Sequence, residues 1–125
     1  MFLIRDDMTI HITRGDAANI FVSATLDENE VVFLQGDVIR FKVFAKKNCA
    51  NVALQKDTVV TEPTSAVEVV LDGTDTAIGE IISKPVDYWY EVELNPDTHP
   101  QTIVGYDENG AKVFKIYPEG GAVNE

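Results

Sequence analysis

The feature that most constrains this chain is an alternation of apolar and polar side chains with a period of two residues. In residues 86–94, apolar side chains occupy every even position, and acids occupy most of the odd positions. A β-strand sends successive side chains to opposite faces, so each such stretch has one face for a core and one for solvent. Half-buried strands of this kind are typical of antiparallel sheets. The same alternation recurs in residues 8–12, 20–26, 39–45 and 67–71.

Residues typical of turns separate the alternating stretches. Asn95-Pro96-Asp97 ends the aromatic stretch, and Gly110 supplies the positive φ expected of a hairpin loop at residues 107–110. Arg14-Gly15-Asp16 follows the first alternating stretch. Integrins read this tripeptide, but Gly–Asp is also ordinary turn chemistry, so we interpret the motif as a turn.

The remaining local signals complete the fold prediction. Residues 52–60, 103–106 and 111–117 are predicted strands, and Thr74-Asp75 is expected to cap a short helical turn. About seven to nine short strands with regular turn signals predict an all-β, antiparallel sandwich. Residues 1–125 are expected to form this single domain, with residues 118–125 as a flexible tail because they lack periodicity.

Composition limits the partners that such a domain can have. The 125 residues include 21 acids and 10 bases, a net charge of −11, which makes nucleic acid a poor partner. No apolar run approaches the roughly 20 residues of a membrane span. Charges at residues 5–7 interrupt the apolar N-terminus, so a secretory signal is not expected. Cys49 is the only cysteine and cannot form an internal disulfide, which fits a reducing compartment such as a bacterial cytoplasm.

The polar residues predict neither catalysis nor a cofactor. No serine lies in a G-x-S-x-G context, and Cys49, His11 and His99 are too far apart in sequence for a zinc motif. Both histidines are expected to be solvated. Asp72, Asp75 and residues 27–30 carry the oxygen ligands that calcium prefers, but EF-hand spacing is absent. Turn and helix-cap chemistry explains these acids without a metal.

The outer face of the aromatic strand holds the candidate interface residues Asp87, Trp89 and Glu91, and Phe44 raises the same question on another strand. A tryptophan on an acidic face can pack in a second apolar layer, anchor a protein interface or stack on a sugar. Basic side chains at residues 40–46 are expected to face these acids, within the sheet or across subunits.

Several short motifs occur in an order that resembles a known group of domains. They read I-T-R-G-D at residues 12–16, G-D-V-I-R-F-K-V at 36–43, L-Q-K-D-T at 54–58, D-T-A-I at 75–78 and Y-W-Y-E-V-E-L at 88–94. Together they resemble the N-terminal domain of phage baseplate upper proteins and related small prophage structural proteins. The likeness extends from about residue 8 to residue 117.

The resemblance implies an immunoglobulin-like β-sandwich that works without catalytic residues in a phage or prophage tail or baseplate. Its implied partners are other virion structural proteins or further copies of itself, with neither nucleic acid nor membrane. The implied location is the bacterial cytoplasm during assembly and then the virion. The chain ends after the sandwich, so we expect a structural role and no receptor-binding region.

Two alternatives remain open at this point. A carbohydrate-binding sandwich would use Trp89 as a platform for a sugar ring. A hydrolase would use Glu91 and Glu93, which stand about 7 Å apart on one strand, but adjacent positions on a flat sheet make no cleft.

Overall fold

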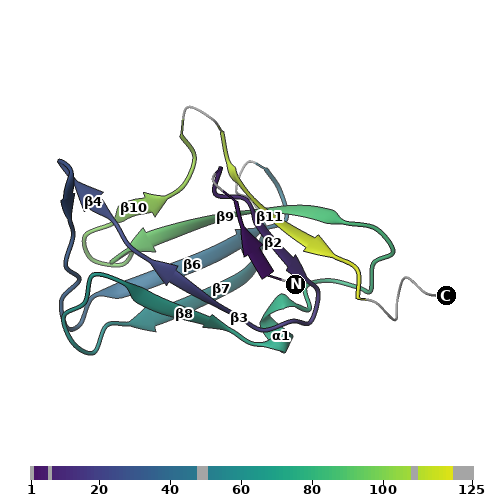
Figure 1. Cartoon of the computed structure of the whole chain (residues 1–125), viewed down its shortest axis with the longest axis horizontal. Coiled ribbons are helices and arrows are strands. Elements are labelled where there is room, and N and C mark those ends of the chain that lie inside the picture. Colours follow the sequence, from purple (N-terminus) through teal and green to yellow (C-terminus); the bar gives the residue numbers. More distant parts are fainter. Residues whose placement is uncertain (1, 6, 48–50, 108–109, 120–125) are drawn as a thin grey trace.

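The computed structural model describes residues 2–5, 7–47, 51–107 and 110–119 of the chain. Within these residues its regular secondary structure consists of strands and one short helix, so the all-β prediction is confirmed (Figure 1). The elements are β1 (Phe2–Ile4), β2 (Ile10–Thr13), β3 (Ala18–Val22), β4 (Thr25–Leu26), β5 (Asn29–Glu30), β6 (Val38–Phe44), β7 (Val52–Val59), β8 (Val67–Leu71), α1 (Gly73–Thr76), β9 (Val86–Leu94), β10 (Gln101–Val104) and β11 (Lys112–Tyr117).

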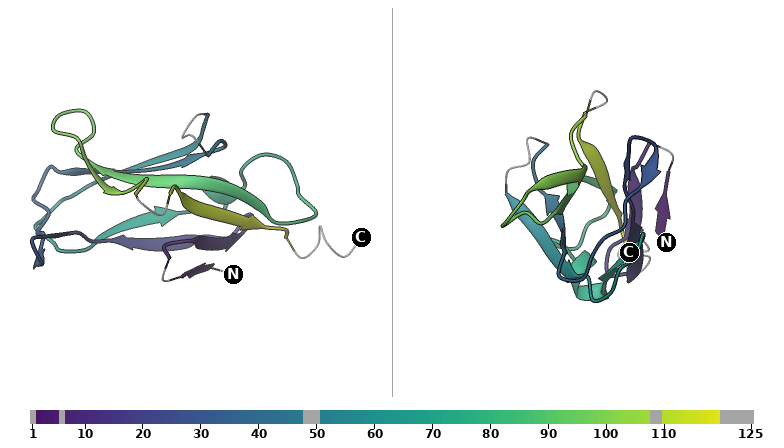
Figure 2. Two further views of the ribbon diagram at one scale, coloured as in Figure 1. Left: turned by 90° about the horizontal axis from the view of Figure 1, so that it is seen from above. Right: turned by 90° about the vertical axis from the view of Figure 1, so that its left-hand side faces the viewer.

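The strands form two layers of unequal width (Figure 2). The large sheet has the order β1-β2-β11-β9-β6-β7, with β10 pairing to β9 beyond the end of β11. The small sheet contains only β3 and β8, and β4 and β5 form a separate hairpin. Every pairing is antiparallel except that of β11 with β2. A sandwich is therefore confirmed, with a small sheet that covers only part of the large one.

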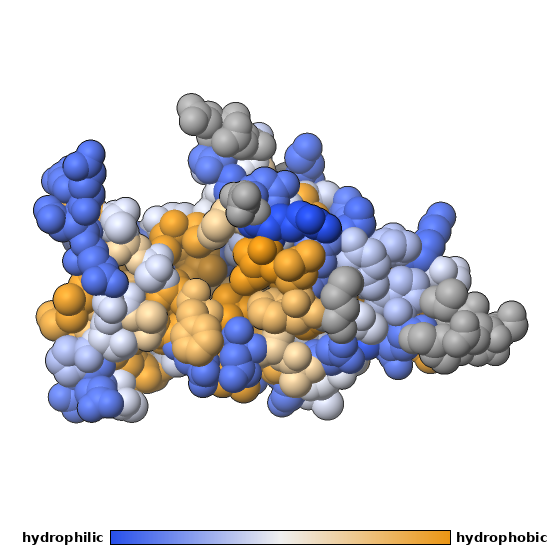
Figure 3. All heavy atoms as spheres, viewed as in Figure 1, coloured by the Kyte–Doolittle hydropathy of each residue, from blue (hydrophilic) through white to orange (hydrophobic). Residues whose placement is uncertain are grey.

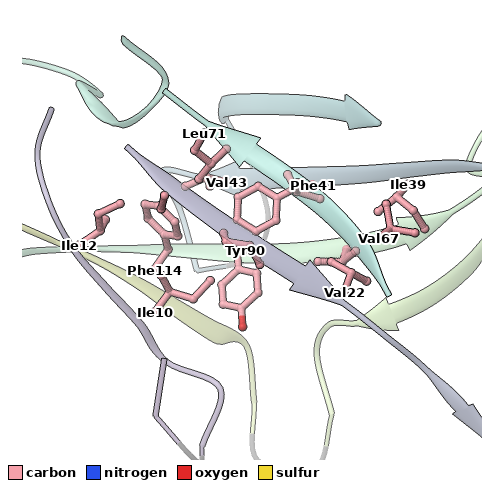
Figure 4. Close-up of a cluster of buried hydrophobic side chains, with 14 of the residues drawn as sticks. Ile10, Ile12, Val22, Ile39, Phe41, Val43, Val67, Leu71, Tyr90 and Phe114 are labelled. Atoms are coloured by element: carbon pink, nitrogen blue, oxygen red, sulfur yellow. The ribbon is translucent and has the colours of Figure 1, made fainter. Parts of the chain in front are cut away.

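The core lies between the layers, on the faces that the alternation predicts. On β6, Ile39, Phe41 and Val43 are completely buried, and the small sheet buries every second residue of both its strands. Phe41 stacks on Tyr90 with ring centroids 5.5 Å apart, and Phe114 meets Phe41 edge to face at 6.0 Å (Figure 4). Such aromatic contacts add to the burial of apolar area that stabilises the sandwich.

The N-cap of the short helix lies two residues earlier than the sequence predicts. Asp72, and not Thr74-Asp75, is the N-cap of α1. The Asp72 carboxylate accepts hydrogen bonds from the Thr74 and Asp75 backbone N–H groups, and the Asp75 carboxylate accepts one from the Asp72 N–H at 2.9 Å. This reciprocal arrangement satisfies backbone donors that the helix itself leaves free.

Several strand boundaries differ from prediction. The strand predicted at residues 103–106, for example, is β10 at Gln101–Val104. β1 was not predicted, because three apolar residues have no alternation to reveal them. Met8 was placed in a strand, but its φ of +72° puts it in a turn, and β2 begins at Ile10. The predicted strand at residues 20–26 is interrupted after Val22, because the β4–β5 hairpin turns on two residues with positive φ and leaves the sheet.

The chain beyond β11 is only partly described. Of the predicted tail at residues 118–125, the structure describes Pro118 and Glu119, and the Glu119 carboxylate lies 2.9 Å from the Arg14 guanidinium. Residues 120–125 and Cys49 lie outside the described residues.

Candidate interaction surfaces

The two candidate aromatics lie side by side on the outer face of the large sheet. Trp89 is directly opposite Phe44 on β6 and Val113 on β11, and directly opposite residues share a face. Trp89 is half-buried, whereas Phe44 is only 3% exposed. The three side chains form a second apolar layer outside the main core. Phe44 therefore offers no surface to a partner in this conformation, and Trp89 offers part of its ring.

The candidate acids on the same face pair with bases inside the chain. The Lys42 ammonium lies 3.0 Å from Glu93 Oε1, in ion-pair contact without hydrogen-bond geometry. Lys115 lies 3.7 Å from the exposed Asp87 carboxylate. Arg40 donates two hydrogen bonds to Asp57 and two to Asp97. The expectation that bases of β6 face the acids of β9 is confirmed within the sheet for Lys42, whereas Arg40 binds acids outside β9.

The surroundings of Glu91 shift its ionisation. Burial raises the pKa of Glu91, and the neighbouring Glu93 carboxylate raises it further. Lys42 partly opposes this rise. Both carboxylates project from adjacent outward positions of one strand, so the pair meets no enclosed cleft of the kind that glycoside hydrolysis needs.

The Arg14-Gly15-Asp16 motif forms a turn, as predicted, with Gly15 at φ +86°. The Arg14 guanidinium donates to the carbonyl oxygens of Gly79 at 2.6 Å and Ala77 at 3.3 Å, besides its ion pair with Glu119. The arginine of the integrin tripeptide is thus bound within its own chain, where it ties three segments together.

The other polar candidates have structural surroundings. His11 was expected to be solvated but is half-buried, and its Nδ1 lies 2.8 Å from the Tyr117 hydroxyl. His99 is exposed. Asp75 binds the Lys56 ammonium at 2.9 Å in addition to its role at α1. Across the described ranges, no three His, Cys, Asp or Glu residues are grouped so that they could hold a metal ion.

The sequence prediction missed an exposed apolar surface on the opposite side of the molecule, over the small sheet and β1. Phe21 on β3 is 66% exposed and Val70 on β8 is 47% exposed. The three residues of β1 and Met8 are also exposed. Figure 3 shows hydrophobic surface across the middle of this face, with hydrophilic surface around it. The available signal was an apolar residue at an outward position of each strand, Phe21 and Val70.

A groove lies beyond the C-terminal end of β3, and a smaller hollow continues beside β3 itself. One part, of about 410 Å³, lies between β4 and β10 and is lined by Ala24, Leu26, Phe33, Leu94 and Ile103, among others. A smaller part, of about 110 Å³, continues beside β3 toward β1 and opens onto the core at Phe41 and Tyr90. The groove exists because the two-stranded layer is too narrow to cover the large sheet.

Scans against models of protein families, curated proteins and solved structures gave no match to this chain. Among the described residues, no helix has the length and apolar character needed to cross a membrane.

Proposed function

We propose that this chain is a non-enzymatic structural module of a phage or prophage particle, at the tail or baseplate, that acts through contacts with other proteins. The observation that carries the proposal is the set of exposed apolar side chains, Phe21 and Val70 above all, on the small sheet. Among the described residues, no further strand pairs with either edge of this sheet. Large exposed apolar patches on soluble proteins mark interaction sites. Unpaired strand edges offer backbone groups to a partner in addition.

The sequence motifs supply the phage part of this proposal. They fall on the turn after β2, on β6, β7 and β9, and at α1, which are the elements that build the sandwich. The proposal includes an immunoglobulin-like arrangement of these strands, supported by two layers in which all pairings but that of β11 with β2 are antiparallel. The partners are other virion proteins or further copies of the chain, first in the bacterial cytoplasm and then in the particle. The acid excess argues against a nucleic-acid partner.

The position of Trp89 does not support the alternative of a carbohydrate-binding module. A sugar platform needs an open ring face, and this ring shares its layer with Phe44 and Val113. We therefore carry only the structural role forward.

Localisation in particles tests the proposal. Antibodies against the purified chain would be applied to particles induced from the strain that carries the gene, with particles from a gene-deleted strain as control. Gold label at one end of the tail is the expected result. Purified particles that lack the chain, while the lysate contains it, would reject the phage assignment.

A further inference from the structure

The starting point is that the small sheet is incomplete along β3. Within the described ranges, β3 pairs only with β8, and its other edge carries no ladder. An edge of this kind presents backbone N–H and C=O groups that can hydrogen-bond to an added strand. At about 3.4 Å per residue, the five residues of β3 span about 17 Å, enough for a strand of about five residues.

The part of the groove beside this edge, of about 110 Å³, is lined mainly by apolar side chains. Ile20 and Val22 of β3 line it on one side, and Val104 of β10 lines it on the other. An added strand would send every second side chain into this apolar groove and the others outward, beside Phe21. The inward side chains of the partner must therefore be apolar.

The charge of the segments that contain the small sheet indicates which outward side chains the added strand should carry. Residues 15–39, which contain β3, β4 and β5, have five acids and no Lys or Arg. Residues 57–83, which contain β8, have six acids and no Lys or Arg. These eleven acids equal the whole net charge of −11, because the rest of the chain has ten acids and ten bases.

Two of these acids, Asp57 and Asp75, are ion-paired with Arg40 and Lys56, but four others are exposed on the small sheet or the β4–β5 hairpin. Glu68 is directly opposite Phe21 in the small sheet, and Asp27, Glu28 and Glu30 are exposed on the β4–β5 hairpin at the end of the groove. A second copy that docked through the same surface would bring acids against acids, which is unfavourable. A basic partner would be attracted to it.

We propose that the free edge of β3 and its adjoining groove bind an extended segment of a basic partner protein, in which apolar residues alternate with Lys or Arg. The segment adds a third strand to the small sheet, places its apolar side chains in the groove and directs its basic side chains toward Glu68 and the β4–β5 hairpin. This inference rests on the proposed role as an interaction module and names the chemistry of the partner.

The test uses the full chain and a synthetic peptide of about seven residues that alternates lysine and valine, long enough to span β3. Binding would be followed by NMR shifts and by amide exchange. We expect shifts in β3, β4 and β10 and slower exchange along β3, with affinity that falls as salt screens the charges. A glutamate–valine peptide and a lysine–valine peptide with a central proline serve as controls and are expected not to bind.

A pair of variants separates the site from general charge. Phe21→Lys places a cation on the free edge and is expected to weaken lysine–valine peptide binding by about tenfold or more. Val52→Lys makes the same charge change at an exposed valine of β7 that lines neither part of the groove, and it is expected to leave binding within about twofold. Equal weakening by both variants would show that only net charge is sensed and would overturn the proposal.

Three other results would also overturn the proposal of a peptide-binding edge. No shift in β3 at millimolar peptide, or equal binding of the acidic peptide, would overturn the proposal. So would a dimer of the free chain that Phe21→Lys disrupts, because the occupant would then be a second copy. Absence of the chain from particles would reject the phage assignment and leave the peptide result standing, so the two failures are distinguishable.

Discussion

The hydroxyl of Tyr90 donates a hydrogen bond to the carbonyl oxygen of Met8 at 2.6 Å, between residues 82 positions apart in the sequence. Tyr90 lies in the core at the centre of the large sheet, and Met8 lies in the turn between β1 and β2. The φ of +72° at Met8 is a strained conformation for a side chain other than glycine. The contact helps to hold this turn, and hence β1, against the sandwich.

Tyr90→Phe is predicted to lower the free energy of unfolding by roughly 1 to 3 kcal/mol, because it leaves the Met8 carbonyl without its partner. Urea unfolding would measure the loss, and the Thr9 amide is expected to exchange faster as the turn loosens. Tyr88→Phe is the matched control: Tyr88 is half-buried, and its hydroxyl has no hydrogen-bond partner within the described ranges. Equal losses in the two variants would contradict a specific role for the Tyr90 contact.

Arg14→Lys is predicted to destabilise the chain by roughly 1 to 3 kcal/mol, because one ammonium cannot replace the fork that binds Gly79, Ala77 and Glu119 together. Thermal unfolding would detect the loss, and exchange of the amides around residues 77–79 would localise it. Arg5→Lys changes the same side chain at an exposed position and is expected to be neutral. If Arg14→Lys left the stability unchanged, the positive charge alone would be enough to hold the segments of Arg14, residues 77–79 and Glu119 together.

Glu91→Gln is predicted to stabilise the chain at neutral pH. Burial and the Glu93 carboxylate raise the pKa of Glu91, so the folded state binds this proton more tightly than the unfolded state does. The stability linked to this proton is fully present below the ordinary glutamate value of 4.5 and is lost as the pH rises through the folded-state pKa. The gain from Glu91→Gln should therefore appear near pH 7 and vanish below about pH 4.

Urea unfolding of Glu91→Gln at a series of pH values would check this trend. Glu62→Gln removes an exposed carboxylate in the loop between β7 and β8 and is the charge-matched control. If both variants gave the same pH profile, the change in stability would come from net charge and not from the burial of Glu91 beside the Glu93 carboxylate.

The parts of the fold that the sequence predicts are those fixed by local alternation. β6, β8 and β9 were predicted because every second residue is apolar, and these residues form the core. The cap of α1 was nearly predicted, because aspartates that can cap cluster at residues 72–75. β1 was not predictable, because its three residues become a strand only by pairing with β2.

The interaction surfaces were harder to predict, because they depend on which strands become neighbours. Nothing local to Phe44 shows that Trp89, 45 positions later, will cover it. The groove arises because the two sheets differ in width, and no single stretch of sequence records that difference. Phe21 and Val70 at outward positions of β3 and β8 were the local signals, and single apolar residues at such positions are common on protein surfaces.

The burial of Phe44 and the exposure of Phe21 give opposite predictions for the same substitution. Phe44→Ala should leave a cavity beside Trp89, lower the free energy of unfolding by about 3 to 5 kcal/mol and shift Trp89 emission to the red. Phe21→Ala removes a side chain that is 66% exposed, so stability should change by no more than about 0.5 kcal/mol. Lysine–valine peptide binding should fall for Phe21→Ala and persist for folded Phe44→Ala. A stable Phe44→Ala protein that had lost peptide binding would move the interaction surface to the outer face of the large sheet.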